Sequence, residues 1–382
     1  MVGSGRSVHT LGRSAAVAAR GHEVRLVTVG PAGEARGVEV RTRARPGALS
    51  APLAAAGFVR DVTAFRPDLL HLHYAGGKLG TLALLSGVHP LVVTVMGGDV
   101  LPEQHQGGLP DRERRATRRI LADAELILAK SEALLSAIRA LGGADERVEV
   151  VRWGVDPGIF RRDEAGAARM RGVLGLHPED RVILSPRILA PLYNVHLLVQ
   201  AMPAVLASVP RAVLVVTEYA ADPGYREAIA AAILRMRLGD RVRLVGVRAH
   251  DEMPALYSLA EVVASVPASD GLPQSLFESM ACGTPALLGR LPAYAEMVRH
   301  GESALLVDLE PAAIGAGLRR LLEDTALARR LSAAAGEEVR RSARLPDEVA
   351  RVEALYERAL RRPRRRCPLL PRAMDALGLL LR

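Results

Sequence analysis

Short runs of valine, isoleucine and leucine recur along the chain, separated by segments whose apolar residues have helical spacing. Continuous apolar strands that alternate with amphipathic helices are typical of parallel sheets covered on both faces. The pattern therefore predicts an α/β protein with two doubly wound, Rossmann-like domains. The predicted strands are VRLVTV, DLLHLH, LVVTVM and ELILA in the first domain, and VILS, AVLVVT, RVRLVG and EVVASV in the second.

A stretch rich in turn-forming residues, from Trp153 to Asp180, marks the expected boundary between the domains. It follows the strand-like VEVV and precedes the second series of strands, which begins near Arg181. Ligands of open α/β sheets bind beyond the carboxyl ends of the strands, so we expect the two domains to face an interdomain cleft. The expected divisions are an N-terminal domain (1–155), a C-terminal domain (156–345), a C-terminal helix (346–362) and a basic, apolar tail (363–382).

The start of the sequence departs from this pattern. Gly3-Ser4-Gly5 is typical of a loop between a strand and a helix, and a helical segment runs from Ser7 to Arg20, yet only two residues precede the loop. One interpretation is that the domain begins with this helix. Because a central parallel strand is costly to omit, we expect instead that the first strand is missing and that the true start lies upstream.

Composition agrees with a two-domain globular protein. A chain of 382 residues is too long for one ordinary core, and its 49% apolar and 24% charged residues favour packed domains over disorder. Cys282 and Cys367 are too few for a disulfide framework or a zinc site. The sequence contains neither a signal-peptide pattern nor an apolar run of about 18 residues. We therefore expect a cytoplasmic protein.

The formal net charge of +9 is concentrated at one end. From Arg358 to Arg382 there are eight arginines and one aspartate, a net of +7. Aromatic residues make up only 3% of the chain, so there is little to stack on bases and we expect no nucleic-acid partner. DRERRATRRI and the tail are basic and amphipathic, which favours peripheral contact with an anionic membrane. A solvated run of charges is the alternative.

The segment DGLPQSLFESMACG, from Asp270 to Gly283, combines two carboxylates with a helix start. It follows the strand EVVASV, and Pro273 is favoured at the first position of a helix, whose N-terminus binds anions. Helical spacing puts Glu278 and Gln274 together on the polar, exposed face. Glu278 could accept hydrogen bonds from ribose hydroxyls, and Asp270 from a sugar hydroxyl. From spacing alone, an ordinary amphipathic helix with a solvated face remains the alternative.

Taken with other segments in the same order, this motif resembles the retaining glycosyltransferases of family 4, two-domain enzymes of the GT-B fold. The resemblance runs from about Arg6 to Leu360 and implies transfer of a sugar from a nucleotide-diphosphate sugar to an acceptor hydroxyl, with retained configuration and without a cofactor or metal. The matching segments are RGHEVRLVTVG, RPDLLHLHYAGG, PLVVTVMGGDV, KSEALLSAIRALG, VVRWGVDPGIF, RVRLVGVRAHDEMPALYSLAEVVASVPAS, SMACGTPAL and AYAEMVRHGESALLV.

The resemblance also implies roles for individual residues. Asp270, which replaces the family's usual Glu, would contact the transferred sugar, Glu278 the nucleotide ribose and Arg187 the diphosphate. The predicted catalytic residues are then Asp270, Asp99 and Arg187. The donor-binding group is Glu278, Gly271, Leu272, Pro273, Gln274, Arg187, Tyr193, Gly246 and Val247.

The first domain would hold the acceptor, which the sequence leaves open as a glycan, a lipid-linked molecule or a small molecule of polysaccharide or glycolipid biosynthesis. His71 and His73 flank Leu72 at a strand end, so both point to the same face and could reach the cleft. No third ligand stands near them in sequence, so we predict no metal site. By resemblance the last helix packs back on this domain. The predicted acceptor residues are Gly5, His73, Met96 and Gly97.

Two positions depart from the family. Met96 stands where a histidine is frequent; a thioether exchanges no protons, and we expect Met96 to be a core residue at a strand end. Where the family has a diphosphate-binding lysine, this sequence has Tyr193-Asn194. Stabilisation of the leaving diphosphate then rests on Arg187, helix amides and Tyr193.

These departures keep two alternatives open. A nucleotide-sugar epimerase of similar fold would need acid and base groups in its cleft, and Met96 weighs against it. A non-catalytic relative that only binds the nucleotide sugar would tolerate both departures.

Overall fold

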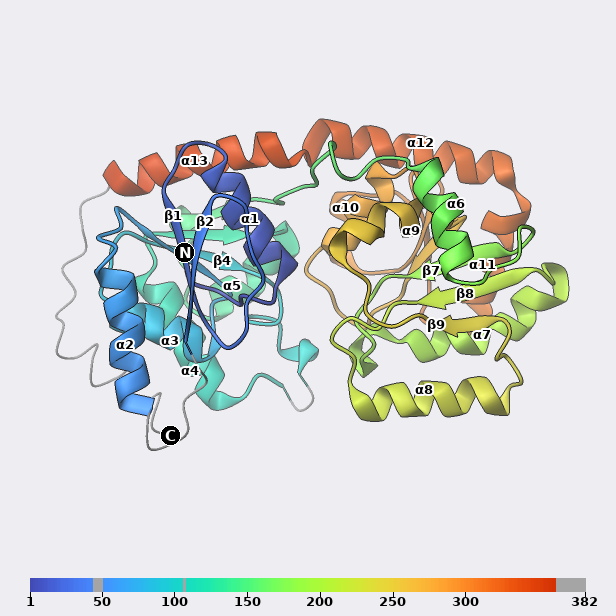
Figure 1. The fold of residues 1–382 in the computed structure, drawn as a ribbon, viewed down its shortest axis with the longest axis horizontal. Coiled ribbons are helices and arrows are strands. Elements are labelled where there is room, and N and C mark those ends of the chain that lie inside the picture. Colours follow the sequence, from blue (N-terminus) through green and yellow to red (C-terminus); the bar gives the residue numbers. More distant parts are fainter. Residues whose placement is uncertain (44–50, 106–107, 362–382) are drawn as a thin grey trace. The chain divides into compact units, whose positions relative to one another are not determined.

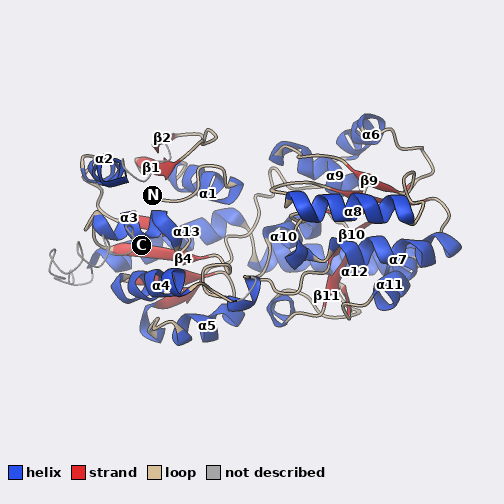
Figure 2. Ribbon diagram, turned by 90° about the horizontal axis from the view of Figure 1, so that it is seen from below, coloured by secondary structure: helices blue, strands red, loops and turns tan. Residues whose placement is uncertain are grey.

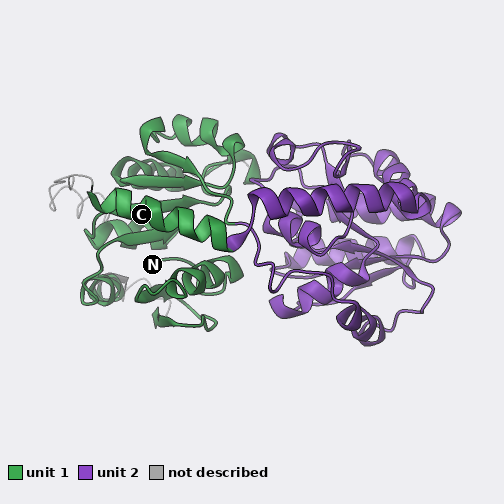
Figure 3. Cartoon of the chain, turned by 90° about the horizontal axis from the view of Figure 1, so that it is seen from above, with its two compact units in different colours: residues 1–153, 346–382 green, residues 154–345 purple. Residues whose placement is uncertain are grey.

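The computed structural model describes residues 1–43, 51–105 and 108–361. Internal contacts divide the chain into two compact units (Figure 3): unit 1 is Met1–Trp153 together with the chain from Pro346 on, and unit 2 is Gly154–Leu345. Each is an α/β unit built on parallel strands, as the hydrophobic pattern predicts. The predicted tail, 363–382, lies outside the described residues.

Unit 2 contains one parallel sheet in the order β12-β11-β10-β7-β8-β9. Its strands β7, β8 and β9 are labelled in Figure 1. The four predicted strands are β7, β8, β9 and β10. Its strands are β7 (Arg181–Ser185), β8 (Ala212–Val216), β9 (Val242–Leu244), β10 (Val262–Ser265), β11 (Ala286–Gly289) and β12 (Leu305–Val307). Its helices are α6 (Glu164–Val173), α7 (Val195–Ser208), α8 (Pro223–Arg235), α9 (Met253–Leu259), α10 (Gln274–Ala281), α11 (Pro311–Glu323) and α12 (Thr325–Ser342).

Alternate residues of these strands enter two separate cores. In β7, Val182 and Leu184 join the core that includes residues of α6, α9 and α10, whereas Ile183 joins the core formed with α7, α8 and α11. Figure 2 shows helices on both sides of the strands. Because both faces are buried, the central strands are apolar runs, which is why the sequence reveals them.

Unit 1 contains a four-stranded parallel sheet, β3-β4-β5-β6, and a parallel pair, β1-β2. The strands predicted from VRLVTV, DLLHLH, LVVTVM and ELILA are β1, β3, β4 and β5. The strands are β1 (Val24–Val29), β2 (Val38–Arg43), β3 (Leu70–His73), β4 (Leu91–Val95), β5 (Leu126–Ala129) and β6 (Val148–Val150). The helices are α1 (Val8–Ala18), α2 (Ala51–Thr63), α3 (Gly77–Leu85), α4 (Asp111–Asp123), α5 (Leu135–Ala140) and α13 (Leu345–Arg361).

A single residue joins the two strand groups of unit 1. Val2, which is fully buried, forms parallel bridges with Val27 of β1 and Leu72 of β3. Its amide donates to the His71 carbonyl at 2.9 Å, and its carbonyl accepts from the His73 amide at 2.8 Å. Val2 therefore stands where a strand between β1 and β3 would lie, and no named strand precedes α1 in the segment 1–43.

Helix α13 packs on unit 1 from residue 346 on. Val349, Val352 and Tyr356 are buried, and the Tyr356 hydroxyl lies 2.5 Å from Nδ1 of His71. The Glu348 carboxylate accepts from the Arg152 amide at 2.8 Å. The last described helix thus completes the unit that the first residues begin.

The basic segment DRERRATRRI forms most of α4, and its inward residues, such as Ile120, are buried while most of its arginines are exposed. Within the described ranges, no helix has the length and apolar character needed to cross a membrane. Contact of α4 with a membrane surface stays a prediction.

Candidate functional site

Asp270 and Arg187 form an ion pair at the carboxyl edge of the unit 2 sheet. Arg187 follows β7 and Asp270 follows the neighbouring strand β10; Nη2 of Arg187 lies 2.7 Å from Oδ2 of Asp270. The two side chains are only 10% and 11% exposed. Arg187 also donates to the Ser275 hydroxyl at 3.1 Å, and the Tyr294 hydroxyl donates to Asp270 at 3.1 Å. Two of the predicted catalytic residues therefore bind each other.

The guanidinium of Arg187 stays charged in this setting. Burial alone would lower its pKa, but the neighbouring Asp270 carboxylate raises it above the usual value. The ring of Tyr193 lies 4.7 Å from the guanidinium carbon, a cation–π contact. Burial, and then the Asp270 charge, hold the pKa of Tyr294 well above its usual range, so this phenol remains protonated.

Asn194, at the position where the family has a lysine, shapes the backbone. Asn194 adopts a left-handed conformation, with φ of 51°, and is the N-cap of helix α7. Its side-chain amide donates to the Val266 carbonyl at 3.0 Å. Asn tolerates this conformation better than Lys does, so the residue fixes the turn that presents Tyr193 to Arg187.

Glu278 lies inside unit 2, which corrects the prediction that it occupies an exposed helix face. It is 5% exposed, because α9 and the turn that precedes it cover this side of α10. The Tyr257 hydroxyl donates to Oε2 of Glu278 at 2.8 Å, and Nε2 of His250 lies 3.1 Å from Oε1. The hydrogen bond that His250 makes to the Glu278 carboxylate raises the pKa of His250. Ser279 and Cys282 on the same helix are also buried.

The remaining predicted donor residues form loops at strand ends. Helix α10 begins at Gln274, with Pro273 as its N-cap, one residue later than predicted. Leu272 is buried with φ of 74°, and the Gly271 amide donates to Asp270 at 2.8 Å. Gln274 donates to the Gly154 carbonyl.

Gly246, after β9, has φ of 73°, and its amide donates to Glu218 at 2.7 Å. Val247 beside it is 67% exposed, which is unusual for so apolar a side chain.

A separate pocket of about 570 Å³ lies within unit 1. It opens where β1, β3 and β4 end and where helices α1 and α3 begin, so two helix N-termini border it. The predicted residues His73 and Met96 line this pocket, together with Ser4, Ser7, Thr10, Val29, Tyr74, Gly76, Gly77, Lys78 and Leu79.

Gly5 and Gly97, predicted beside them, serve the backbone next to this pocket. The Gly5 amide donates to the Thr28 hydroxyl at 2.9 Å, and a Cβ at Gly5 would lie 2.5 Å from that of Ala32. The Gly97 amide donates to Asp99 at 2.9 Å.

Buried polar groups lie at the pocket, which His73 lines, and next to its lining residues. His73 stacks on His71 at 4.3 Å, and within the described chain neither ring nitrogen of His73 has a hydrogen-bond partner. Burial lowers the pKa of both histidines well below its usual value, so both are neutral. Arg13 is 4% exposed and lies over the Trp153 ring at 4.7 Å. Burial lowers its pKa to about 9.

Met96 is half-buried on the pocket wall, so the expectation of a core residue is wrong. Its sulfur lies 3.1 Å from Nη1 of Arg13. The thioether therefore sits beside a buried cation at the pocket edge.

Asp99, predicted as catalytic, is 1% exposed and does not line the pocket. Its carboxylate accepts from the amides of Ala75 (2.7 Å), Met96 (3.0 Å) and Gly97 (2.9 Å). Burial raises its pKa, although these hydrogen bonds oppose the shift. These hydrogen bonds hold the loops after β3 and β4, and a catalytic role for Asp99 stays a prediction.

Sequence reasoning missed several of these side chains, namely Tyr294, Ser275, Tyr257 and His250 in unit 2 and Lys78, Tyr74 and Arg13 in unit 1. Tyr257 and His250 lie in a segment that already supports the family resemblance, but a tyrosine within an apolar helix is typical of a core. Across 1–43, 51–105 and 108–361, no three His, Cys, Asp or Glu side chains gather as metal ligands would.

The two halves of the chain match two family descriptions. Residues 2–158 match "Glycosyltransferase Family 4" and residues 167–338 match "Glycosyl transferases group 1". A D-inositol 3-phosphate glycosyltransferase of Thermobispora bispora is 30% identical over 91% of this chain and 82% of its own length. Relatives of the same name from Nocardioides and Segniliparus rotundus are 30% and 28% identical, but the match spans only 63% and 58% of their lengths.

Solved structures share the fold. HepE of Anabaena, solved with UDP and glucose, superimposes with a TM-score of 0.79 at 20% identity, covering 93% of this chain and 98% of that one. Sucrose-phosphate synthase of Thermosynechococcus elongatus gives a TM-score of 0.75 at 22% identity, covering 92% of each chain. At this identity the likeness shows the fold alone, which is the GT-B fold.

Proposed function

Because the chain belongs to the group 1 glycosyltransferases of family 4, we propose that it transfers a sugar from a nucleotide-diphosphate sugar to an acceptor hydroxyl, with retention of configuration. The single observation that carries this proposal is the buried Arg187–Asp270 pair beside the N-terminus of α10, with Glu278 one turn further along that helix.

The donor in this proposal binds to unit 2. Its diphosphate accepts from Arg187 and from amides at the start of α10, a favourable place for anions. Asp270, now bound to Arg187, then turns to a sugar hydroxyl, and Glu278 accepts from the ribose. HepE has been solved with UDP and with UDP-glucose, which supports UDP sugars as the first donors to test.

The acceptor binds in the unit 1 pocket. Lys78, the helix N-termini and the hydroxyls of Ser4, Ser7 and Thr10 suit a small polyhydroxylated molecule, with or without a phosphate. The relatives named D-inositol 3-phosphate glycosyltransferase support an acceptor of this class.

The proton of the acceptor hydroxyl passes to an oxygen of the leaving diphosphate. The bond from the anomeric carbon to that diphosphate breaks while the acceptor oxygen bonds to the same face of the carbon. Arg187 and the α10 amides stabilise the charge that develops on the diphosphate. This route fits Met96, because it asks no base of the position where the family often has a histidine.

Donor binding and turnover test the assignment separately. A thermal-shift screen of UDP, GDP, ADP and TDP sugars identifies the donor, and Glu278→Gln should then weaken its binding about tenfold, as loss of a charged hydrogen-bond partner does. Asp270→Ala should mainly lower kcat. The exposed Glu323→Gln is the matched control. Unchanged binding and turnover in both site variants would overturn the assignment.

NMR of the donor incubated without acceptor separates the remaining alternatives. A transferase leaves the donor intact or hydrolyses it slowly. An epimerised but intact donor would establish an epimerase. In a separate assay with a broad panel of acceptors, donor binding without nucleotide release would establish a non-catalytic relative.

A further inference from the structure

A second cavity in unit 2, of about 530 Å³, lies at the opposite edge of the same sheet. Its wall includes Arg181, the first residue of β7, together with Glu261 and Pro285, which come directly before β10 and β11. Arg187 and Asp270 follow the far ends of β7 and β10, so the length of a strand, roughly 15 Å, separates the two places. The cavity is therefore distinct from the donor site.

Positive charge predominates in this cavity. Four arginines line it, against the two carboxylates of Glu164 and Glu261. Arg181 binds Glu261 through two nitrogens, at 2.5 and 2.9 Å, and Arg162 binds Glu164 at 2.7 Å. Among residues 1–43, 51–105 and 108–361, the other two, Arg171 and Arg329, form no ion pair. Two guanidinium charges are thus left for a ligand.

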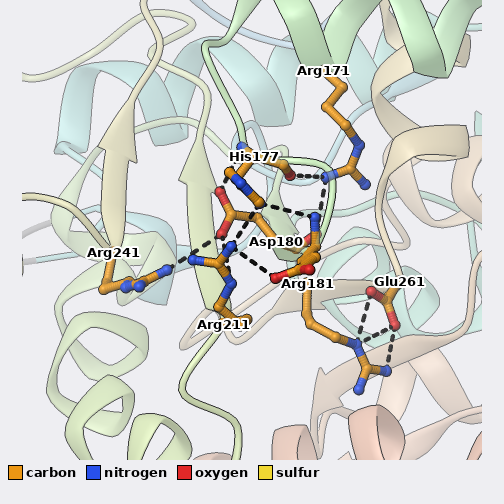
Figure 4. Close-up of polar contacts among 8 residues, drawn as sticks. Arg171, His177, Asp180, Arg181, Arg211, Arg241 and Glu261 are labelled. Carbon is orange, nitrogen blue, oxygen red and sulfur yellow. Dashed lines mark hydrogen bonds and ion pairs between the residues drawn. The ribbon is translucent and has the colours of Figure 1, made fainter.

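The guanidinium of Arg171 is fixed in place. Nη1 of Arg171 donates to the carbonyls of His177 and Asp180, at 2.8 and 3.0 Å (Figure 4). Asp180 is anchored in turn by Arg241 at 3.3 Å, in the network that Figure 4 shows. Side chains held before a ligand arrives lose little conformational entropy on binding, which favours affinity.

The rest of the wall suits an organic group larger than phosphate. The hydroxyl residues Ser258, Thr325 and Ser332 line the cavity beside small apolar residues such as Ala167 and Ala260. Its volume lies in the range of small-molecule sites, about 300 to 1,000 Å³. Guanidinium groups pair with phosphate oxygens through parallel hydrogen bonds, and hydroxyls suit hydroxylated carbon chains.

We propose that this cavity binds the phosphate monoester of a small hydroxylated molecule. Arg171 and Arg329 contact the phosphate, and the hydroxyl side chains contact the remainder. The site is independent of the proposed transfer reaction, because it lies away from Arg187 and Asp270 and uses none of their groups.

Isothermal titration calorimetry of the full chain, with excess UDP to occupy the donor site, tests the proposal. The probes are ribose 5-phosphate, glucose 1-phosphate and glycerol 3-phosphate, with ribose and inorganic phosphate as matched arms. At least one monoester should bind more tightly than either matched arm. No binding by any monoester, or equal binding by ribose or inorganic phosphate, would overturn the proposal.

Variants locate the binding. Arg329→Gln removes an exposed side chain of α12 and should weaken the bound monoester about tenfold, as loss of a charge-assisted hydrogen bond does. Its neighbour Arg330 is equally exposed and does not line the cavity, so Arg330→Gln should leave affinity unchanged. On α6, Arg171→Gln should weaken binding in the same way. Arg169→Gln, which changes an arginine that does not line the cavity, should leave affinity unchanged. Equal losses in a site variant and its control would show unspecific charge attraction and overturn the site.

Discussion

Charged side chains at the carboxyl edge of the unit 2 sheet bind one another, whereas the polar side chains under the unit 1 pocket have few partners. In unit 2, Arg187 is paired with Asp270, and Glu278 accepts from Tyr257. In unit 1, His73 has no hydrogen-bond partner within the described residues, and the partners of Arg13 are a sulfur and an aromatic ring.

The two regions differ in how the free-energy cost of burying polar groups is offset. A buried pair is stable only while both members remain, because removing one leaves an uncompensated charge. A buried group without partners already bears its desolvation cost, so its removal is cheap. Unit 2 should therefore be sensitive to single substitutions at its site, and unit 1 tolerant.

The largest expected effect is in the ion pair. Asp270→Ala leaves the Arg187 guanidinium buried without its carboxylate and should lower the free energy of unfolding by about 3 kcal/mol, measured by urea denaturation. Asp308→Ala is the control, because its pair with Arg290 is mostly exposed and should be worth less than about 1 kcal/mol. Similar losses in both variants would contradict the distinction.

Tyr257→Phe should cost about 2 kcal/mol, because it removes a buried hydroxyl that donates to the Glu278 carboxylate. Tyr225→Phe removes a hydroxyl that bonds to the backbone amide and the ring of His196, which carry no charge, so about 1 kcal/mol is expected there. Urea denaturation of the two variants side by side measures the difference. A smaller loss at Tyr257 than at Tyr225 would show that the charge of Glu278 adds nothing.

Arg13→Met should leave the free energy of unfolding unchanged or raise it by up to about 1 kcal/mol, because it replaces a buried cation with an apolar chain of similar length. Arg147→Met provides the contrast: Arg147 donates to the carbonyls of Leu121, Ala122 and Ala124, and its loss should cost about 2 kcal/mol. A loss at Arg13 as large as that at Arg147 would contradict the interpretation that Arg13 lacks strong partners.

The smallest effects are pH-dependent and opposite in sign. The pKa of His250 is raised by Glu278, so its stabilising contribution is fully present below about pH 6.5 and is lost as pH rises through the folded-state pKa. The stability difference between the native chain and His250→Gln should thus shrink on going from acid to alkaline pH.

The pKa of His73 is lowered by burial, so the native chain loses stability relative to His73→Phe as pH falls below about 6.5. Melting temperatures recorded for the three proteins across this range check both signs. Parallel slopes for the two histidines would contradict the comparison.

Most strands can be predicted from the sequence, because strands that are buried on both faces consist of continuous apolar residues. Strand β2, VEVRTR, is missed because that strand is largely exposed and alternates with charged residues. Also missed are β11 and β12, which are short and follow turn-forming segments, Gly283-Thr284-Pro285 and Gly301-Glu302-Ser303. Asp270 and Glu278 could also be found from the sequence, because the motif that contains them is one continuous segment.

What the sequence could not supply is what covers each motif. Helical spacing gives the polar face of α10 but not its neighbours, and Tyr257, 21 residues before Glu278, covers it by tertiary packing. Asp99 likewise reads as a retained acid, although three amides from two loops occupy its oxygens. Met96 was expected in the core, yet its sulfur contacts the buried Arg13 and its side chain lines the pocket.

Helix α13 sets the order in which the protein can be completed during synthesis. Residues 346–361 leave the ribosome after all of unit 2, yet they carry Tyr356 and Glu348, which bind His71 and Arg152. The unit translated first is therefore the last to acquire its full set of contacts. A nascent chain stopped at residue 345 should expose unit 1 to protease while unit 2 resists; equal resistance of both units would show that unit 1 matures without its final helix.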